Sequence, residues 1–213
     1  MADRWDRDVY VERIRSRLQD FVESVSVVQS IPVGEDDGSS DLEVWRFEQL
    51  PLLEQLAELV TPSNSGIGAR MLASRPVVNT EALRVQARIR HEIGYWFEVL
   101  LRRRSPATTP LAMQTLSSLA PTLTDLQLSG LDDDVRRWWC WARVTTGWSD
   151  VQMHPHVRCI NCDTRDSITF VPNLVTDSGL ATCSACGEGW DEERIGLLRR
   201  HFTESEEAEA EGA

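Results

Sequence analysis

The sequence contains no lysine: its 22 basic residues are all arginine, and 34 acidic residues bring the formal net charge to −12. A charge of this size repels nucleic acid and anionic lipid, which argues against general attraction to either, although a local basic patch remains compatible with it. The arginines are spread along the chain, so we attribute the absence of lysine to a GC-rich coding sequence.

Long apolar segments are also missing. No run approaches the ~18 residues of a membrane-spanning helix, and the N-terminus, MADRWDRDVYVERIRSRL, is charged throughout and lacks the apolar stretch of a signal peptide. We therefore expect a cytoplasmic protein with no membrane partner. Thiols stay reduced in that compartment, and the odd number of five cysteines also disfavours a disulfide framework.

Known catalytic signatures are absent as well. The chain has no phosphate-binding loop, no dinucleotide-binding glycine fingerprint, no HExxH and no GxSxG motif. Carboxylates are numerous but cannot be placed as an acid and base pair on facing elements. Enzyme activity has no positive support, and we predict neither catalytic nor cofactor-binding residues.

Apolar periodicity predicts a mainly α protein. In residues 1–30, an apolar stripe at steps of three and four indicates an amphipathic helix; it consists of Ile14, Leu18, Phe21, Val25 and Val28. Residues 31–48 begin with IPVGEDDGSSD, which predicts a flexible loop. A helical domain follows over residues 49–150, with helices near 51–60, 80–101, 109–121 and 132–146, the second capped by Asn79 or Thr80.

The last of these helices carries VRRWWCWARVTTGW. We expect its tryptophans to seat the helix in the core and to contact the C-terminal module. A second interpretation is that Trp141 or Trp148 forms a stacking platform for a base or an anchor for a partner.

Four cysteines form two pairs. Cys159, Cys162, Cys183 and Cys186 follow the pattern C-x2-C-x20-C-x2-C, which is typical of a four-thiolate zinc site. Two residues between thiolates let each pair supply two corners of a tetrahedron. Gly187 and Asp163 follow the two pairs, at the position where such a turn favours a left-handed backbone.

The residues between and after the pairs predict a zinc ribbon over 151–202. SITFV and LATC are β-branched or alternating and indicate a β-hairpin, while WDEERIGLLRRHF has the periodicity and charge order of a short closing helix. Four thiolates fill the metal's shell, so we expect structural Zn²⁺. The final segment, 203–213, has five glutamates and predicts a disordered acidic tail.

The sequence supports some alternatives to a four-cysteine zinc site better than others. Iron in a rubredoxin-like centre uses the same four thiolates and is not excluded. A thioredoxin-type redox pair is disfavoured because no βαβ pattern accompanies it. His154 and His156 precede the first pair, but four cysteines already complete a tetrahedron, and Cys140 suits a small buried apolar residue better than a fifth ligand.

One stretch is locally basic. Residues 81–104 hold six arginines against three glutamates. A helix ends at Arg102, Arg103 and Arg104, and positive charge is favourable at that end of a helix. These arginines are therefore explained as charges on a solvent-exposed surface. A nucleic-acid or partner contact through Arg84, Arg88, Arg102, Arg103 and Arg104 is the alternative.

Three segments resemble a group of uncharacterised proteins from actinobacteria and their phages. They are SRPVVNTEALRVQARIRHEIGYWFEVL, VRRWWCWARVTTGW and the cysteine module ending CSACGEGWDEERIGLL. The resemblance covers most of residues 68–202, and only the paired cysteines match a defined sequence motif. It implies a helical domain followed by a zinc ribbon, a phage-encoded or actinobacterial source, and no established activity.

These observations lead to two functional hypotheses. The first is a non-catalytic, cytoplasmic zinc-ribbon protein that acts as an adaptor for a protein partner. The second is a nucleic-acid-binding accessory factor that uses the Arg-rich helical face. The sequence does not indicate the oligomeric state.

Overall fold

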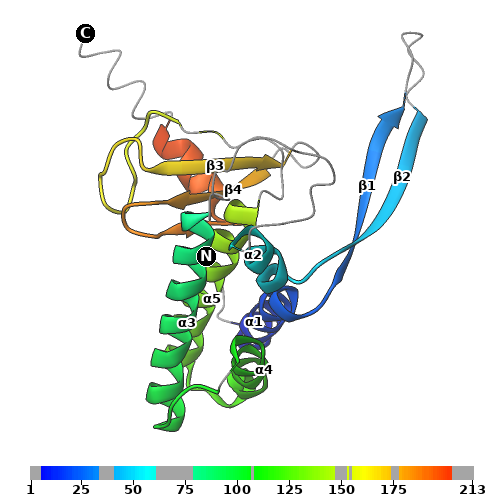
Figure 1. Ribbon diagram of the computed structural model, residues 1–213. Helices are drawn as coiled ribbons and strands as arrows, with labels where there is room; N and C mark the ends of the chain where they lie inside the picture. The colour runs from blue at the N-terminus through cyan, green and yellow to red at the C-terminus, as the bar shows by residue number, and fades with distance from the viewer. Residues whose placement is uncertain are drawn as a thin grey trace, which may run out of the picture.

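The protein is described by a computed structural model over residues 6–33, 41–60, 79–106, 108–146, 153, 155–173 and 178–202. A helical bundle is formed by α1 (Arg7–Val22), α2 (Leu52–Val60), α3 (Thr80–Leu101), α4 (Thr109–Leu119) and α5 (Asp125–Thr146), with a 3-10 turn η1 (Ala120–Thr122) after α4. A small antiparallel sheet of order β3-β4-β5 lies at one end of the bundle (Figure 1).

The sheet consists of β3 (Ile168–Asn173), β4 (Ser178–Cys183) and β5 (Gly189–Trp190), and residues 195–202 form a closing helix after it. The predicted fold class, mainly α with a C-terminal hairpin and short helix, is confirmed. The two-residue strand β5, which pairs Trp190 with Ala181, has no predicted counterpart in the sequence. None of the described helices has the length and apolarity needed to cross a membrane.

Helix starts follow local capping signals. The Asn79 side chain accepts hydrogen bonds from the backbone N–H groups of Glu81 and Ala82, as predicted. α5 starts seven residues before the predicted position 132. There Gln127 accepts a hydrogen bond from the Thr124 N–H, and the Gln127 N–H faces the Thr124 hydroxyl at 3.4 Å. This is a capping box, and its sequence signature is TDLQ.

The segment between α1 and α2 corrects the sequence prediction. Residues 1–30 do not form one helix, and residues 31–48 are not a loop throughout. α1 ends at Val22, and β1 (Val25–Val33) pairs antiparallel with β2 (Asp41–Gln49) in a hairpin that projects from the helices (Figure 1). VSVVQSIPV and LEVWRF are rich in β-branched and aromatic residues, and Pro32 opposes a helix. The spacing of Val25 and Val28 fits a helical stripe by coincidence.

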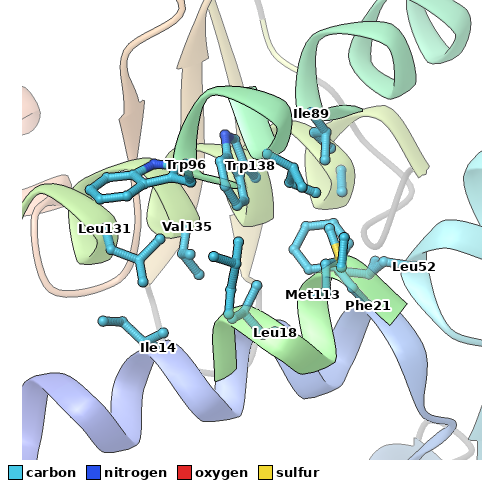
Figure 2. Close-up of a cluster of buried hydrophobic side chains, with 14 of the residues drawn as sticks. Ile14, Leu18, Phe21, Leu52, Ile89, Trp96, Met113, Leu131, Val135 and Trp138 are labelled. Atoms are coloured by element: carbon cyan, nitrogen blue, oxygen red, sulfur yellow. The ribbon is translucent and has the colours of Figure 1, made fainter. Parts of the chain in front are cut away.

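One apolar core unites all five helices. Ile14, Leu18 and Phe21 of α1 are buried in it, as predicted. Figure 2 shows these side chains meeting residues from the other four helices: Leu52, Ile89, Trp96, Met113, Leu131, Val135 and Trp138. α5 contacts α1, α2 and α3 as well as the ribbon strands. It is therefore the element through which the bundle positions the cysteine module.

Two neighbouring aromatic residues of α3 test this account of the core. Phe97 is fully buried, whereas Tyr95 is 59% exposed. We expect Phe97→Ala to lower the free energy of unfolding by about 3–5 kcal/mol because it leaves a cavity. Tyr95→Ala is the matched control and should change it by about 0.5 kcal/mol or less. Urea denaturation of the metal-loaded protein measures both, and equal losses would contradict the assignment of the core.

Candidate metal centre

Four cysteine sulfur atoms converge at the end of the ribbon. The Sγ atoms of Cys159, Cys162, Cys183 and Cys186 all lie within 4.8 Å of one another. Cys159 and Cys186 are 3.9 Å apart, and Cys162 and Cys183 are 3.8 Å apart. A tetrahedron with metal–sulfur bonds of about 2.3 Å has edges of about 3.8 Å. The cysteines are free thiols rather than disulfides, and their spacing fits a tetrahedral metal ion.

Each cysteine pair sits on a turn of the same construction. The Cys159 carbonyl accepts from the Asp163 N–H at 2.8 Å, and the Cys183 carbonyl accepts from the Gly187 N–H at 2.8 Å. Asp163 has φ 56° and Gly187 has φ 75°. The predicted left-handed positions are thus confirmed, and the two knuckles present their sulfurs toward one point.

Polar groups surround the sulfurs. The Asn161 N–H donates to Cys159 Sγ at 3.4 Å, the Asn161 amide reaches Cys186 Sγ at 3.6 Å, and the Ser167 hydroxyl lies 3.1 Å from Cys183 Sγ. Hydrogen bonding to Thr164 lowers the pKa of the Cys162 thiol to about 6, while burial raises the pKa of the Cys159 thiol to about 12. Donors directed at sulfur are the groups that stabilise thiolate ligands.

Cys140 and His156, two of the other candidate ligands, do not belong to this cluster. Cys140 is fully buried on α5, and burial raises its pKa to about 12, so its thiol stays protonated. His156 is exposed and pairs with Asp166 at 3.1 Å. His154 lies outside the described residues. No further group of three or more metal-binding side chains occurs in the part of the chain that the structure describes.

The second knuckle is anchored directly in the helical bundle. The Trp141 indole N–H donates to the Gly187 carbonyl at 2.8 Å. Arg136, only 3% exposed, donates to the Gly189 carbonyl and binds the Glu188 carboxylate at 2.9 Å. Three consecutive residues after Cys186 are thereby held by α5.

Glycine permits this close approach. A Cβ atom at position 189 would lie 2.9 Å from the Cβ of Cys140, and one at Gly187 would lie 2.5 Å from the Arg88 guanidinium. Cys140 and Val144 of α5 pack against Val171 and Leu180 of the sheet, which continues the contact. The ribbon is therefore packed on the bundle and is not a separate appendage.

A network of ion pairs closes the other side of the interface. Asp132 of α5 is 2% exposed and binds Arg13 at 3.1 Å and Arg17 at 3.4 Å. Arg17 also binds Asp191, just after β5, at 2.6 Å. Burial raises the pKa of Asp132, and the two arginines oppose that rise. The network links α1, α5 and the ribbon through charges that have little access to water.

The tryptophans of α5 lie on different sides of the helix, so that each one contacts a different part of the molecule. Trp138 is buried in the bundle and donates to Glu92 at 2.6 Å, and Trp139 donates to Asp20 at 2.8 Å. Trp141 is 6% exposed at the ribbon interface. The predicted contact with the C-terminal module is confirmed, and the suggestion that Trp141 is an accessible stacking platform is wrong because the ribbon and Arg88 cover it. Trp148 lies outside the described residues.

The predicted arginines separate into two groups. Arg84 pairs with Glu81 at 2.6 Å, and Arg88 pairs with Glu92 at 3.1 Å while its guanidinium lies 4.2 Å from the centre of the Trp141 ring. Both also line a cavity of about 360 Å³ between α3, α5 and the ribbon. Arg102, Arg103 and Arg104 are exposed at the far end of α3. The five arginines do not form one continuous face.

No known protein family, curated protein or solved structure matches the chain at a significant level. The resemblance to proteins of actinobacteria and their phages therefore stays a prediction, as does the source that it implies.

Metal content tests the cysteine cluster. We expect about one zinc ion per chain after purification, and loss of that zinc in Cys183→Ser, because three thiolates and a serine hydroxyl do not complete the site. Cys140→Ala is the matched control and should keep the metal. Mass spectrometry of metals after desalting measures zinc and iron together. Full zinc retention in Cys183→Ser would contradict the site, and bound iron would contradict the choice of metal.

The buried arginine of α5 tests the anchoring of the knuckle. Arg136→Met removes the hydrogen bonds to Gly189 and Glu188 while it keeps most of the apolar volume, so we expect a loss of about 2–4 kcal/mol in stability. Arg137→Met, one residue on, removes partly exposed pairs with Asp134 and, at 3.9 Å, with Glu92, from a side chain that is 30% exposed, and should cost less than Arg136→Met, about 1 kcal/mol. Urea denaturation with zinc present distinguishes the two. A loss as small in Arg136→Met as in Arg137→Met would show that the contact does not anchor the ribbon.

Proposed function

We propose that the protein is a non-catalytic interaction module, an adaptor, in which a structural zinc ion holds the ribbon in place on the helical bundle. The observation that carries this proposal is the closed set of four sulfurs within 4.8 Å of one another. Zinc with four protein ligands keeps no position for water or substrate, which is the usual arrangement of a structural site. Iron with the same ligands would serve the same structural role.

The contacts after Cys186 give the metal a role beyond the ribbon itself. Gly187, Glu188 and Gly189 extend directly from the last ligand and are the groups that Trp141 and Arg136 bind. Their positions are fixed from one side by the metal and from the other by α5. Zinc binding therefore stabilises one rigid body made of ribbon and bundle, and a surface that spans both parts exists only when the metal is bound.

A protein is the partner that suits such a composite surface. The net charge of −12 disfavours nucleic acid over most of the molecule. Apolar side chains are also exposed on the ribbon: Ile160, at the tip of the first knuckle, is 48% exposed, and Leu197 of the closing helix is 49% exposed. Exposed apolar groups within a polar surface are common contacts in protein interfaces.

Affinity capture with two matched baits tests the adaptor role. Zinc-loaded wild-type protein and Cys183→Ser are immobilised, and a nuclease-treated lysate of the source organism is passed over both. We expect a protein that the wild type retains and Cys183→Ser does not, and that binds the wild type again after separate purification. Cys140→Ala controls for loss of a thiol that does not bind metal.

Two outcomes would contradict the proposal. Equal retention by wild type and Cys183→Ser would show that the zinc-dependent surface is not the binding surface. In a parallel run with lysate that is not treated with nuclease, retention of nucleic acid alone would show that the partner belongs to a different class of macromolecule.

A further inference from the structure

The C-terminal end of α3 carries arginines that differ from the others on the same helix. Arg84 and Arg88 are neutralised by Glu81 and Glu92. Arg90 and the run Arg102 to Arg104 are exposed, and none of these four has an ion-pair partner among the residues that the structure describes. α3 thus has a neutral half beside the ribbon and a positively charged half away from it.

Helix capping does not explain the position of Arg90. Positive charges in the last turn of a helix compensate its dipole, which accounts for Arg102 and its neighbours. Arg90 lies three turns earlier, where the dipole offers no such gain. It nevertheless lies on the same hollow as Arg102, Arg103 and Arg104. The four arginines therefore line one hollow, and for Arg90 this place is not explained by helix capping.

The hollow has the lining of a site for a flat, negatively charged ligand. Its volume is about 670 Å³. Tyr95 stands in it with 59% of its surface exposed, and the absence of a side chain at Gly94 leaves space beside the ring, because a Cβ there would meet no atom within 4 Å. Glu98 is the one acidic residue of the lining, which also includes His91. Against four arginines, Glu98 leaves a local excess of positive charge.

We propose that this surface, formed by Arg90, Tyr95 and Arg102 to Arg104, binds single-stranded nucleic acid. The guanidinium groups bind successive phosphates, and the exposed Tyr95 ring stacks on one base. The site follows the C-terminal half of α3, and its arginine run lies at the end opposite the ribbon (Figure 1). The proposal goes beyond the zinc-dependent adaptor role and does not require a partner on the ribbon.

The distribution of charge favours a single strand over a duplex. From His91 to Arg102 the helix rises about 16 Å, enough for about three or four nucleotides. A duplex extends much further on both sides and would meet the acidic remainder of a chain with net charge −12. Tyr95 can stack only on a base that is unpaired. An acidic protein segment would satisfy the arginines but would leave the ring without a planar partner.

Fluorescence anisotropy with labelled poly-dT and poly-U oligonucleotides of about ten residues tests the proposal on the zinc-loaded protein. We expect Arg103→Glu with Arg104→Glu to weaken binding at least about thirtyfold, and the wild-type affinity to fall with salt at a logarithmic slope of about −2 to −3, as for three or four phosphate contacts. Tyr95→Ala should weaken it about five- to a hundredfold, and Tyr95→Phe should restore it. Arg102 is left in place because it caps α3 with φ 51°.

Matched controls separate binding from folding and from net charge. Arg15→Glu with Arg200→Glu changes the net charge by the same amount at two exposed positions of α1 and the closing helix, and should leave the affinity within about twofold. Arg103→Lys with Arg104→Lys keeps the charge and should keep most of the binding. Circular dichroism and zinc content verify that each variant is folded and loaded with metal.

Several results would overturn the proposal. These are unchanged binding in Arg103→Glu with Arg104→Glu, an equal loss in the Arg15 and Arg200 control, no effect of Tyr95→Ala, or equal affinity for a duplex of the same length. Competition by a poly-glutamate peptide as effective as that by poly-U would instead assign the patch to an acidic protein. Because all measurements use zinc-loaded protein, failure here leaves the adaptor proposal standing, and failure of the adaptor test leaves this one standing.

Discussion

The convergence of four cysteine sulfur atoms, all within 4.8 Å of one another, is the constraint on which the rest of the ribbon depends. The apolar core of the ribbon is small and consists mainly of Ile168, Ala181, Trp190, Ile195 and Leu198. Burial on this scale does not offset the entropy of ordering the chain. Structural zinc supplies about 10–16 kcal/mol to the folding of small modules of this kind. A metal ion held by the four sulfurs would also set the directions of the backbone groups that leave the second knuckle, and these groups are the ones that reach α5.

α5 couples the two cores of the molecule. One side of the helix places Val135 and Trp138 in the bundle, and another places Cys140 and Val144 against the sheet. Arg136 lies between them, and its buried guanidinium depends on the Gly189 carbonyl and on Glu188. A buried cation is costly unless it is paired and hydrogen-bonded. The bundle therefore needs the ribbon to satisfy its own polar groups, just as the ribbon needs the bundle to cover its strands.

The accuracy of the sequence predictions follows the range of the interactions behind them. The sequence predicts well those features that depend on a few adjacent residues. These are the cysteine spacing, the left-handed positions at Asp163 and Gly187, and the cap at Asn79. The hairpin of β1 and β2 was missed because apolar spacing of three and four residues fits a helix as well as part of a strand. The burial of Trp141 could not be predicted, because it depends on the Gly187 carbonyl of a segment 46 residues away. The TDLQ signature shows that the start of α5 was present in the sequence but was overlooked.

The arginines of this lysine-free chain have separate roles that only the three-dimensional structure distinguishes. Arg13, Arg17 and Arg136 neutralise carboxylates at the interface between bundle and ribbon, where water is largely excluded. A divalent metal ion held by four thiolates would leave about two negative charges at the ribbon end. The arginine run begins 14 residues after Arg88, whose guanidinium lies beside Gly187 of the second knuckle. That distance is about 21 Å along the helix, more than twice the ~8 Å screening length at physiological salt. The charges of the metal site therefore do not neutralise Arg102 to Arg104, and the positive field at that end of the molecule depends on the local balance of Arg90, Glu98 and the arginine run alone.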